Sequence, residues 1–305
     1  MSHAEKNKKQ KQKRYGRETA MGFLFCSPYI IYFLILFLIP LIWAFWLSGM
    51  DWNLMSANRV FVGLQNFIDA FKDREVIAAF KNSLKYFIFV VPLSLAGGLI
   101  IALLVNRLPV RWRGVASVLF FIPYLTSGVA VSVMTKYLFS YNSILNQFLR
   151  EKLNLNINWF IDGRSALAVI ILMIVWKLSG YYALYLTAAI QGISNDVQEA
   201  AMLDGSIGAH RFFHITLPMT LPTVTTILTL ATGTAFGVYT EPFLLTEGGP
   251  DNATTTWTLE IYYRAFTRFD SGYGTAMAIL FAIQIFVTIK LINLCMSRLN
   301  ERYGC

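Results

Sequence analysis

The sequence predicts an all-α, polytopic membrane protein with six transmembrane helices, and two observations support this prediction. Of the 305 residues, 56% are hydrophobic and only 14% are charged, whereas a soluble domain usually carries about 25% charged residues. A bilayer core roughly 30 Å thick requires about 20 consecutive apolar residues of helix, and the chain contains six runs near that length. Such runs could also be buried core helices of a soluble protein, but six of them, almost free of charge, favour membrane spans. The expected spans are residues 21–47, 86–105, 115–134, 166–190, 221–240 and 275–294.

A strongly basic segment precedes the first span. Residues 1–17 carry seven of the 26 Lys and Arg residues. The apolar run that follows is too long for the core of a secretory signal peptide, so we expect an uncleaved first helix. Positive residues favour the cytoplasmic side, which predicts that both termini are cytoplasmic. The predicted organisation is a basic cytoplasmic tail (1–20), a six-helix membrane domain (21–298) and a cytoplasmic C-terminus (299–305).

Prolines and threonines interrupt the apolar pattern of the spans. A proline removes one backbone hydrogen bond and is expected to kink its helix; the prolines concerned are Pro28, Pro40, Pro92 and Pro123. The fifth span and its ends are rich in threonine. These hydroxyls either bond back to carbonyls of their own helix or face a partner helix or a polar path. They belong to Thr220, Thr223, Thr225, Thr226, Thr229, Thr232, Thr234 and Thr240.

Lys177 is the only charged residue deep within an expected span. A lysine is costly in lipid, so it is expected to face the protein interior, a cavity or a partner. Trp176, Tyr181 and Tyr182 flank it, and aromatic rings beside hydrogen-bonding groups suit a sugar. The alternative is that Lys177 has a purely structural partner.

The sequence shows no catalytic constellation. His210 and His214 stand at helical i, i+4 spacing, as zinc ligands can, but Glu199 lies eleven residues upstream of His210 and no cysteine is close. Cys26, Cys295 and Cys305 have no metal-site or disulfide spacing. We therefore expect no metal site. Without a GxxxxGK[ST] stretch, this chain is expected to bind no nucleotide, and ATP with its Mg²⁺ would belong to a partner subunit. Because only the tail is strongly basic, nucleic acid is not an expected partner.

A polar segment of about residues 191–218 separates the fourth and fifth spans, and charge places it in the cytoplasm. Ser194 or Asn195 can cap a short helix over about 196–203, and Asn195 with Gln198 is typical of a capping box. Gly205 is placed to end that helix in the left-handed conformation. A second short helix is expected next, with "LP" opening the fifth span. Such a helix–Gly–helix element, with small residues exposed, suits docking into a groove on another protein.

The same segment resembles the EAA loop of permease subunits in ABC-type importers. The pattern EAA---G---------I-LP is met by "EAAMLDG", nine further residues and "I-LP". "FLLTEGGPDNATTT", "NRLPVRWRGVASVLFFIPY" and "VGLQNFIDAF" are similar to segments of the sugar-importing branch, which includes the larger maltose permease and a glycerol-3-phosphate permease. The resemblance covers nearly all of residues 20–300.

The resemblance implies the type I ABC importer permease fold in a bacterial-type cytoplasmic membrane. Its implied role is carbohydrate import by alternating access, with glycerol phosphate, a polyol or an acidic sugar as alternative substrates. The implied partners are a second permease, two cytosolic ATPase subunits, an extracytoplasmic solute-binding protein and the lipid bilayer. A membrane scaffold without transport activity is a disfavoured alternative.

The resemblance also assigns roles to individual positions. The residues implied to couple the permease to the ATPase are Glu199, Ala200, Ala201, Asp204, Gly205, Ile215, Leu217 and Pro218. Those implied to line the substrate pathway are Lys177, Tyr181, Thr234 and Val238, with Leu178, Ala231 and Ala235 at neighbouring lining positions.

Overall fold

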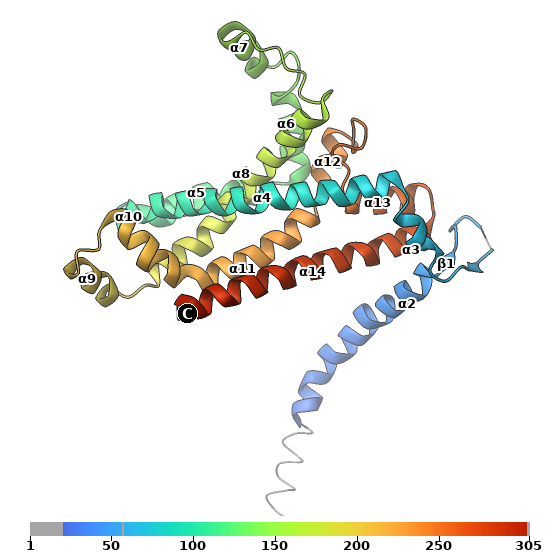
Figure 1. Cartoon of the computed structure of the whole chain (residues 1–305), viewed down its shortest axis with the longest axis horizontal. Coiled ribbons are helices and arrows are strands. Elements are labelled where there is room, and N and C mark those ends of the chain that lie inside the picture. The colour runs from blue at the N-terminus through green and yellow to red at the C-terminus, as the bar shows by residue number, and fades with distance from the viewer. Residues whose placement is uncertain (1–20, 57, 304–305) are drawn as a thin grey trace, which may run out of the picture.

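The computed structural model describes residues 21–56 and 58–303, so the predicted basic tail lies outside the described residues (Figure 1). The chain is almost entirely helical, as predicted, apart from a small antiparallel hairpin formed by β1 (Met50–Asp51) and β2 (Val60–Phe61). Within the described residues, five helices are long and apolar enough to cross a membrane, and a bent helix pair supplies a sixth candidate.

The first membrane helix, Met21–Ser48, diverges from the rest of the fold (Figure 1). It contains a π-helical turn, η1 (Leu34–Leu38), directly before α2 (Ile39–Ser48). The amide of Ile39 bonds to the carbonyl of Leu34, so the wide turn lies just ahead of Pro40, which has no N–H to donate. None of the most apolar stretch of this helix is buried in the chain. Lipid or another protein must therefore cover it.

Three helices form the main core. α4 (Arg74–Arg107) packs along α8 (Gly163–Gln191), and α11 (Leu217–Phe236) packs against both. Gly98 permits the close approach of α4 to α8, because a Cβ at this position would lie about 3.1 Å from Tyr182 and from the α8 backbone. The core side chains include Tyr86, Tyr182 and Ile227, all fully buried. Gly97 permits the same close approach, because a Cβ there would collide with the side chain of Ser179 on α8.

The third expected span is not a single helix. α5 (Val110–Leu125) and α6 (Gly128–Leu138) meet at an angle of 86°. The residues between them, Thr126 and Ser127, have extended backbone conformations. The expected span 115–134 is therefore broken three residues after Pro123, where the sequence predicts a kink. Hydropathy does not predict a bend of this size, because it records composition and not backbone direction.

The bend is held close to two other helices. The carbonyl of Phe120 lies so close to Gly180 on α8 that any Cβ at position 180 would collide with it. α12 (Thr240–Leu245), which follows α11, packs against α6. Gly128, the first residue of α6, lies close to α12, since a Cβ there would contact Thr240. The bend thus lies against α8 on one side and α12 on the other.

A short helix that the sequence analysis did not identify, α7 (Ile144–Leu153), lies at the end of a projecting arm (Figure 1). The buried side chain of Asn146 organises the arm: its amide donates to the carbonyls of Ser140 and Ile157, and its oxygen accepts from the Trp159 indole. The arm is consequently an ordered polar element outside the helical bundle.

The end of the fold opposite α9 (Asn195–Leu203) contains α3 (Gln65–Ala70), α13 (Trp257–Tyr262) and the start of α14 (Ser271–Tyr303). An ion cluster there joins the start of α4 to α13 and the turn that follows it. Arg264, in the π-helical turn η3 (Tyr263–Thr267), donates to Asp73, Glu75 and Glu260. Burial raises the pKa of the Glu260 carboxyl, and the hydrogen bond from Arg264 opposes that shift. This cluster joins residues almost 200 positions apart.

The two ends of the bundle carry different elements (Figure 1). α9 and α10 (Gly208–Arg211) lie at one end, together with the C-terminal end of α14, whereas α3, α12 and α13 lie at the other. α14 continues without interruption through the expected boundary at residue 298, up to Tyr303.

Candidate functional site: the loop between α8 and α11 and the transmembrane ion pair

A short capped helix, α9, follows α8 after a three-residue link. The Ser194 side chain caps it by accepting from the amide of Val197, at 3.4 Å. Of the two predicted caps, Ser194 is therefore correct and Asn195 is wrong. The predicted capping box is also not formed, because the Gln198 amide donates to the carbonyl of Ile193 instead.

The C-terminal end of α9 is a Schellman motif built on Gly205. The amide of Ser206 bonds to the carbonyl of Ala201 at 2.8 Å, and that of Gly205 to the carbonyl of Met202 at 3.1 Å. Gly205 has φ of +74°, as predicted, a conformation that costs a residue with a Cβ about 1–2 kcal/mol. Space is not the constraint, since a Cβ at Gly205 would meet nothing within 4 Å.

The segment after Gly205 forms part of the next membrane helix. α10, the π-helical turn η2 (Phe212–Thr216) and α11 are continuous, and the whole helix is assigned to Gly208–Leu245. The prediction that "LP" opens the fifth span was wrong. The amide of Leu217 bonds to the carbonyl of Phe212, which widens the helix just before Pro218. Because of this wide turn, the helix continues through Pro218 and does not break there.

The eight predicted coupling residues fall into two groups. Glu199, Ala200, Asp204 and Gly205 are exposed at the tip of the loop. The other group is wholly or partly buried at the base of the loop and consists of Ala201, Ile215, Leu217 and Pro218. The tip therefore offers a docking surface, and the base connects it to the bundle.

The two histidines of the loop pack against each other. Their ring centroids are 4.1 Å apart, Nδ1 of His210 lies 2.9 Å from the Ser206 hydroxyl, and Nδ1 of His214 lies 3.0 Å from the carbonyl of His210. Both Nδ1 atoms thus contact protein groups.

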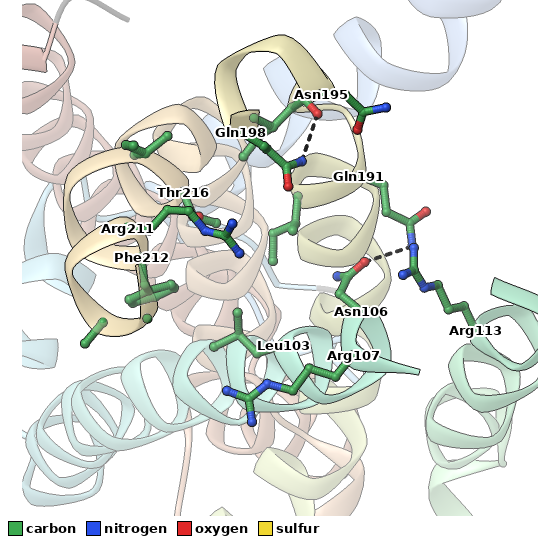
Figure 2. Close-up of a pocket in the computed structure, with 15 residues that line it drawn as sticks. Leu103, Asn106, Arg107, Arg113, Gln191, Asn195, Gln198, Arg211, Phe212 and Thr216 are labelled. Atoms are coloured by element: carbon green, nitrogen blue, oxygen red, sulfur yellow. Dashed lines mark hydrogen bonds between the residues drawn. The ribbon is translucent and has the colours of Figure 1, made fainter. Parts of the chain in front are cut away.

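A cavity of about 740 Å³ lies beneath the loop (Figure 2). Its wall comes from the ends of α4 and α8 and from the beginnings of α5, α9 and the α10–η2 segment. The Gln191 amide donates to the Asn106 oxygen at 3.0 Å across one side. Ile215, one of the predicted coupling residues, contributes to the apolar part of the wall.

Lys177 has an acidic partner that the sequence analysis did not find. Its Nζ atom lies 4.0 Å from Oε1 of Glu241 on α12, and both side chains are 13% exposed. The pair lies beside Gly128, the first residue of α6. Lys177 thus has a structural partner, at the bend between α5 and α6, as one of the two alternatives for this residue predicts.

Tyr181 lies one turn of α8 from Lys177, in a cluster of aromatic rings. Its ring stacks on Tyr124 with centroids 4.2 Å apart and an interplanar angle of 8°, and its hydroxyl lies 2.9 Å from that of Tyr185. Phe121 extends the stack. Because the rings of Tyr124 and Tyr185 are also partly exposed, the cluster presents an aromatic surface with two adjacent hydroxyls.

The other pathway residues differ in accessibility. Thr234 is exposed, and its hydroxyl donates to the carbonyl of Leu230. The Val238 side chain is buried, and its carbonyl accepts from the hydroxyls of Thr256 and Thr258. Val238 therefore borders no open space in this conformation. The neighbouring positions Leu178, Ala231 and Ala235 are also buried.

Most threonine hydroxyls of the fifth span bond back to their own helix. This arrangement, one of the two alternatives, holds for Thr220, Thr225, Thr226, Thr229, Thr232 and Thr234. Thr229 also approaches Asn293 of α14 at 3.5 Å. The hydroxyls are thus mainly satisfied within the helix.

Comparison with known proteins identifies the family. Residues 13–302 match the binding-protein-dependent transport system inner membrane component family. The chain belongs to this family. It is an ABC importer permease, a multi-pass transport component of the inner membrane.

Individual relatives match this chain over almost its whole length. The permease is 32% identical over 275 residues to the probable ABC transporter permease protein YurN of Bacillus subtilis, covering 88% of this chain and 92% of that protein. It is 30% identical over 265 residues to the trehalose/maltose transport system permease protein MalF of Thermococcus litoralis, covering 87% and 89%. The predicted resemblance to sugar-importer permeases is confirmed.

A solved structure confirms the fold. The permease superposes with a TM-score of 0.81 on a chain of a bacterial alginate ABC transporter, crystallised with its alginate pentasaccharide-bound periplasmic protein. The two chains are 22% identical, and the match covers 94% of this chain and 97% of that one. The type I ABC importer permease fold is thus established for this chain.

Proposed function

We propose that this permease imports a carbohydrate by alternating access, with α9 coupling it to a separate cytosolic ATPase. The observation that supports coupling most strongly is the continuity of the loop with the bundle. α9 is joined to α8 by three residues, and the helix that starts at Gly208 continues into α11. A displacement of α9 therefore acts directly on two core helices.

The proposed assembly contains a second permease, two ATPase subunits and an extracytoplasmic binding protein. The subunit itself performs no hydrolysis and holds no cofactor; ATP and Mg²⁺ bind to the ATPase. Both termini and the α9 loop face the cytoplasm in this proposal. The basic residues 1–17 and the location of α9, α10 and the end of α14 at one end of the bundle support that orientation.

The aromatic surface around Tyr181 supports a sugar as the substrate. Stacked tyrosine rings offer a flat apolar face beside hydroxyl groups, which matches the two kinds of surface of a sugar ring. Because Glu241 neutralises Lys177, the pair favours a neutral carbohydrate over an acidic sugar or glycerol phosphate. The similarity to the trehalose/maltose permease also supports a neutral carbohydrate as the substrate.

An uptake screen with the intact transporter tests this function. Cells producing the full complex are offered labelled neutral oligosaccharides, monosaccharides, polyols, acidic sugars and glycerol phosphate, and neutral carbohydrate uptake is expected. Tyr181→Ala should lower kcat/KM about fivefold, because one aromatic contact is worth about 1 kcal/mol. Thr234→Ala should also alter transport.

The matched control is Leu172→Ala, a change on the exposed face of the same helix α8. It should leave uptake unchanged. Uptake restricted to non-carbohydrates would contradict the proposed substrate. Equal kinetics for the Tyr181 and Leu172 variants would remove the aromatic surface from the pathway.

A further inference from the structure

The cavity beneath the α9 loop has a cationic wall without acids. Arg107, Arg113 and Arg211 line it, together with amide side chains, and no Asp or Glu does. Figure 2 shows the Arg211 side chain extending toward the space between Gln198 and Leu103, and Arg113 extending toward Asn106 and Gln191. Three guanidinium groups from three separate helical segments thus share one cavity.

No acid within residues 21–56 and 58–303 forms an ion pair with these guanidinium groups. Among the described residues, every ion pair involves other cations, namely Lys177, Arg264 and Arg268. Of the three arginine side chains, only Nε of Arg113 forms a hydrogen bond within the part of the chain that the structure describes, and it donates to the carbonyl of Leu108. A guanidinium has five N–H donors, so most donors of the three arginines are free.

Local helix electrostatics explain only one of the three positions. Arg107 is the last residue of α4, where a cation interacts favourably with the negative end of the helix dipole. Arg113 lies in the first turn of α5, where the dipole disfavours a positive charge. Arg211 ends the short α10 within a helix that continues into α11. A ligand with negative charge would account for all three.

The lining also defines the kind of anion. Guanidinium groups bind phosphate through paired hydrogen bonds and fit its geometry better than that of a halide. Leu103, Ile190, Phe212 and Ile215 give the cavity an apolar part beside its charged part. Because Arg107 ends a membrane-spanning helix, the charged part lies at the edge of the apolar span, where lipid phosphates are found.

We propose that this cavity is a binding site for a phosphate-bearing anion. Both the headgroup of an anionic phospholipid and a soluble phosphate compound present this chemistry. Because the wall joins α4, α5 and α8 to α9 and α10, an occupant holds the loop against the bundle. The site does not depend on the proposed carbohydrate transport, since binding is measured on the permease itself.

Two binding measurements on the full-length permease in detergent test the proposal. Native mass spectrometry counts bound palmitoyl-oleoyl-phosphatidylglycerol, with the zwitterionic phosphatidylcholine as the comparison lipid. In lipid-free micelles, the thermal unfolding midpoint is measured as inorganic phosphate is added. Chloride at the same ionic strength serves as the comparison anion. The variant Arg107→Gln/Arg211→Gln removes two of the guanidinium groups. The control Arg111→Gln removes an exposed arginine in the first turn of α5 that does not line the cavity.

We expect saturable binding that the double variant weakens at least about tenfold, whereas Arg111→Gln binds like the unaltered permease. Binding of phosphatidylglycerol alone identifies a lipid headgroup as the ligand, and stabilisation by inorganic phosphate identifies a soluble one. Absence of both effects overturns the proposal. So does equal binding by the double variant and the control, provided that circular dichroism shows both to be folded.

Discussion

Replacing Gly205 by valine is expected to detach the permease from its ATPase and to lower uptake at least about tenfold. Gly205 adopts φ of +74° at the end of α9, and a β-branched residue is disfavoured there by more than the about 1–2 kcal/mol that an ordinary side chain costs. The two Schellman hydrogen bonds to Ala201 and Met202 would be lost with that conformation. The readouts are the amount of ATPase that co-purifies with the permease and the rate of uptake.

Gly205→Asn is the matched control for this prediction. Asparagine tolerates the left-handed conformation far better than valine does, and an added Cβ meets no neighbour. This variant should therefore retain most of the bound ATPase. If valine and asparagine had the same effect, the conformation of Gly205 would not be what positions the loop.

Replacing Glu241 by glutamine is expected to leave Lys177 without a counter-ion inside the membrane domain. An unpaired lysine in that environment costs about 3 kcal/mol, and both side chains are largely shielded from solvent. The pair also contacts the start of α6, so its loss should disturb the bend between α5 and α6. We expect a lower thermal unfolding midpoint and little uptake.

The double variant Lys177→Met/Glu241→Gln tests whether Lys177 has only a structural role or also acts in transport. It removes the uncompensated charge and should restore the unfolding midpoint. Uptake returning with stability would assign Lys177 a structural role, and uptake remaining low would place Lys177 in the pathway. Glu247→Gln, a change of the same type in an exposed loop residue, should have no effect. Unaltered stability of the Glu241 variant would contradict the prediction.

Local features of the loop could be predicted from the sequence, and long-range ones could not. The ends of α9 depend on hydrogen bonds between residues at most five positions apart, so Ser194 and Gly205 were identifiable. Lys177 and Glu241 are 64 positions apart, and nothing local marks them as partners. The same reasoning applies to the cavity, because Arg211 lies 98 positions after Arg113 and nothing local marks the two as neighbours.

Two features of the helices escaped prediction for a different reason. A proline usually signals a kink or a helix start, but the π-helical turns before Pro40 and Pro218 let the helix continue. In the third span, Pro123 predicts a kink, but the apolar pattern continues beyond it and does not indicate the 86° bend after Leu125. Hydropathy depends on side-chain composition, so it indicates neither the π-helical turns nor the bend. The continuity through η2 is the feature that links the α9 loop to α11.

The most direct test of coupling is a cross-link between the tip of α9 and the ATPase. Leu203, which is 89% exposed, is replaced by cysteine in a permease from which Cys26, Cys295 and Cys305 have been removed. The assembled complex is then treated with a short bifunctional thiol reagent. Val110, exposed at the beginning of α5 and outside α9, is replaced by cysteine as the control position. Coupling through α9 predicts a cross-linked permease–ATPase species for Leu203→Cys and little for Val110→Cys; an intact complex in which Leu203→Cys forms no such species would contradict it.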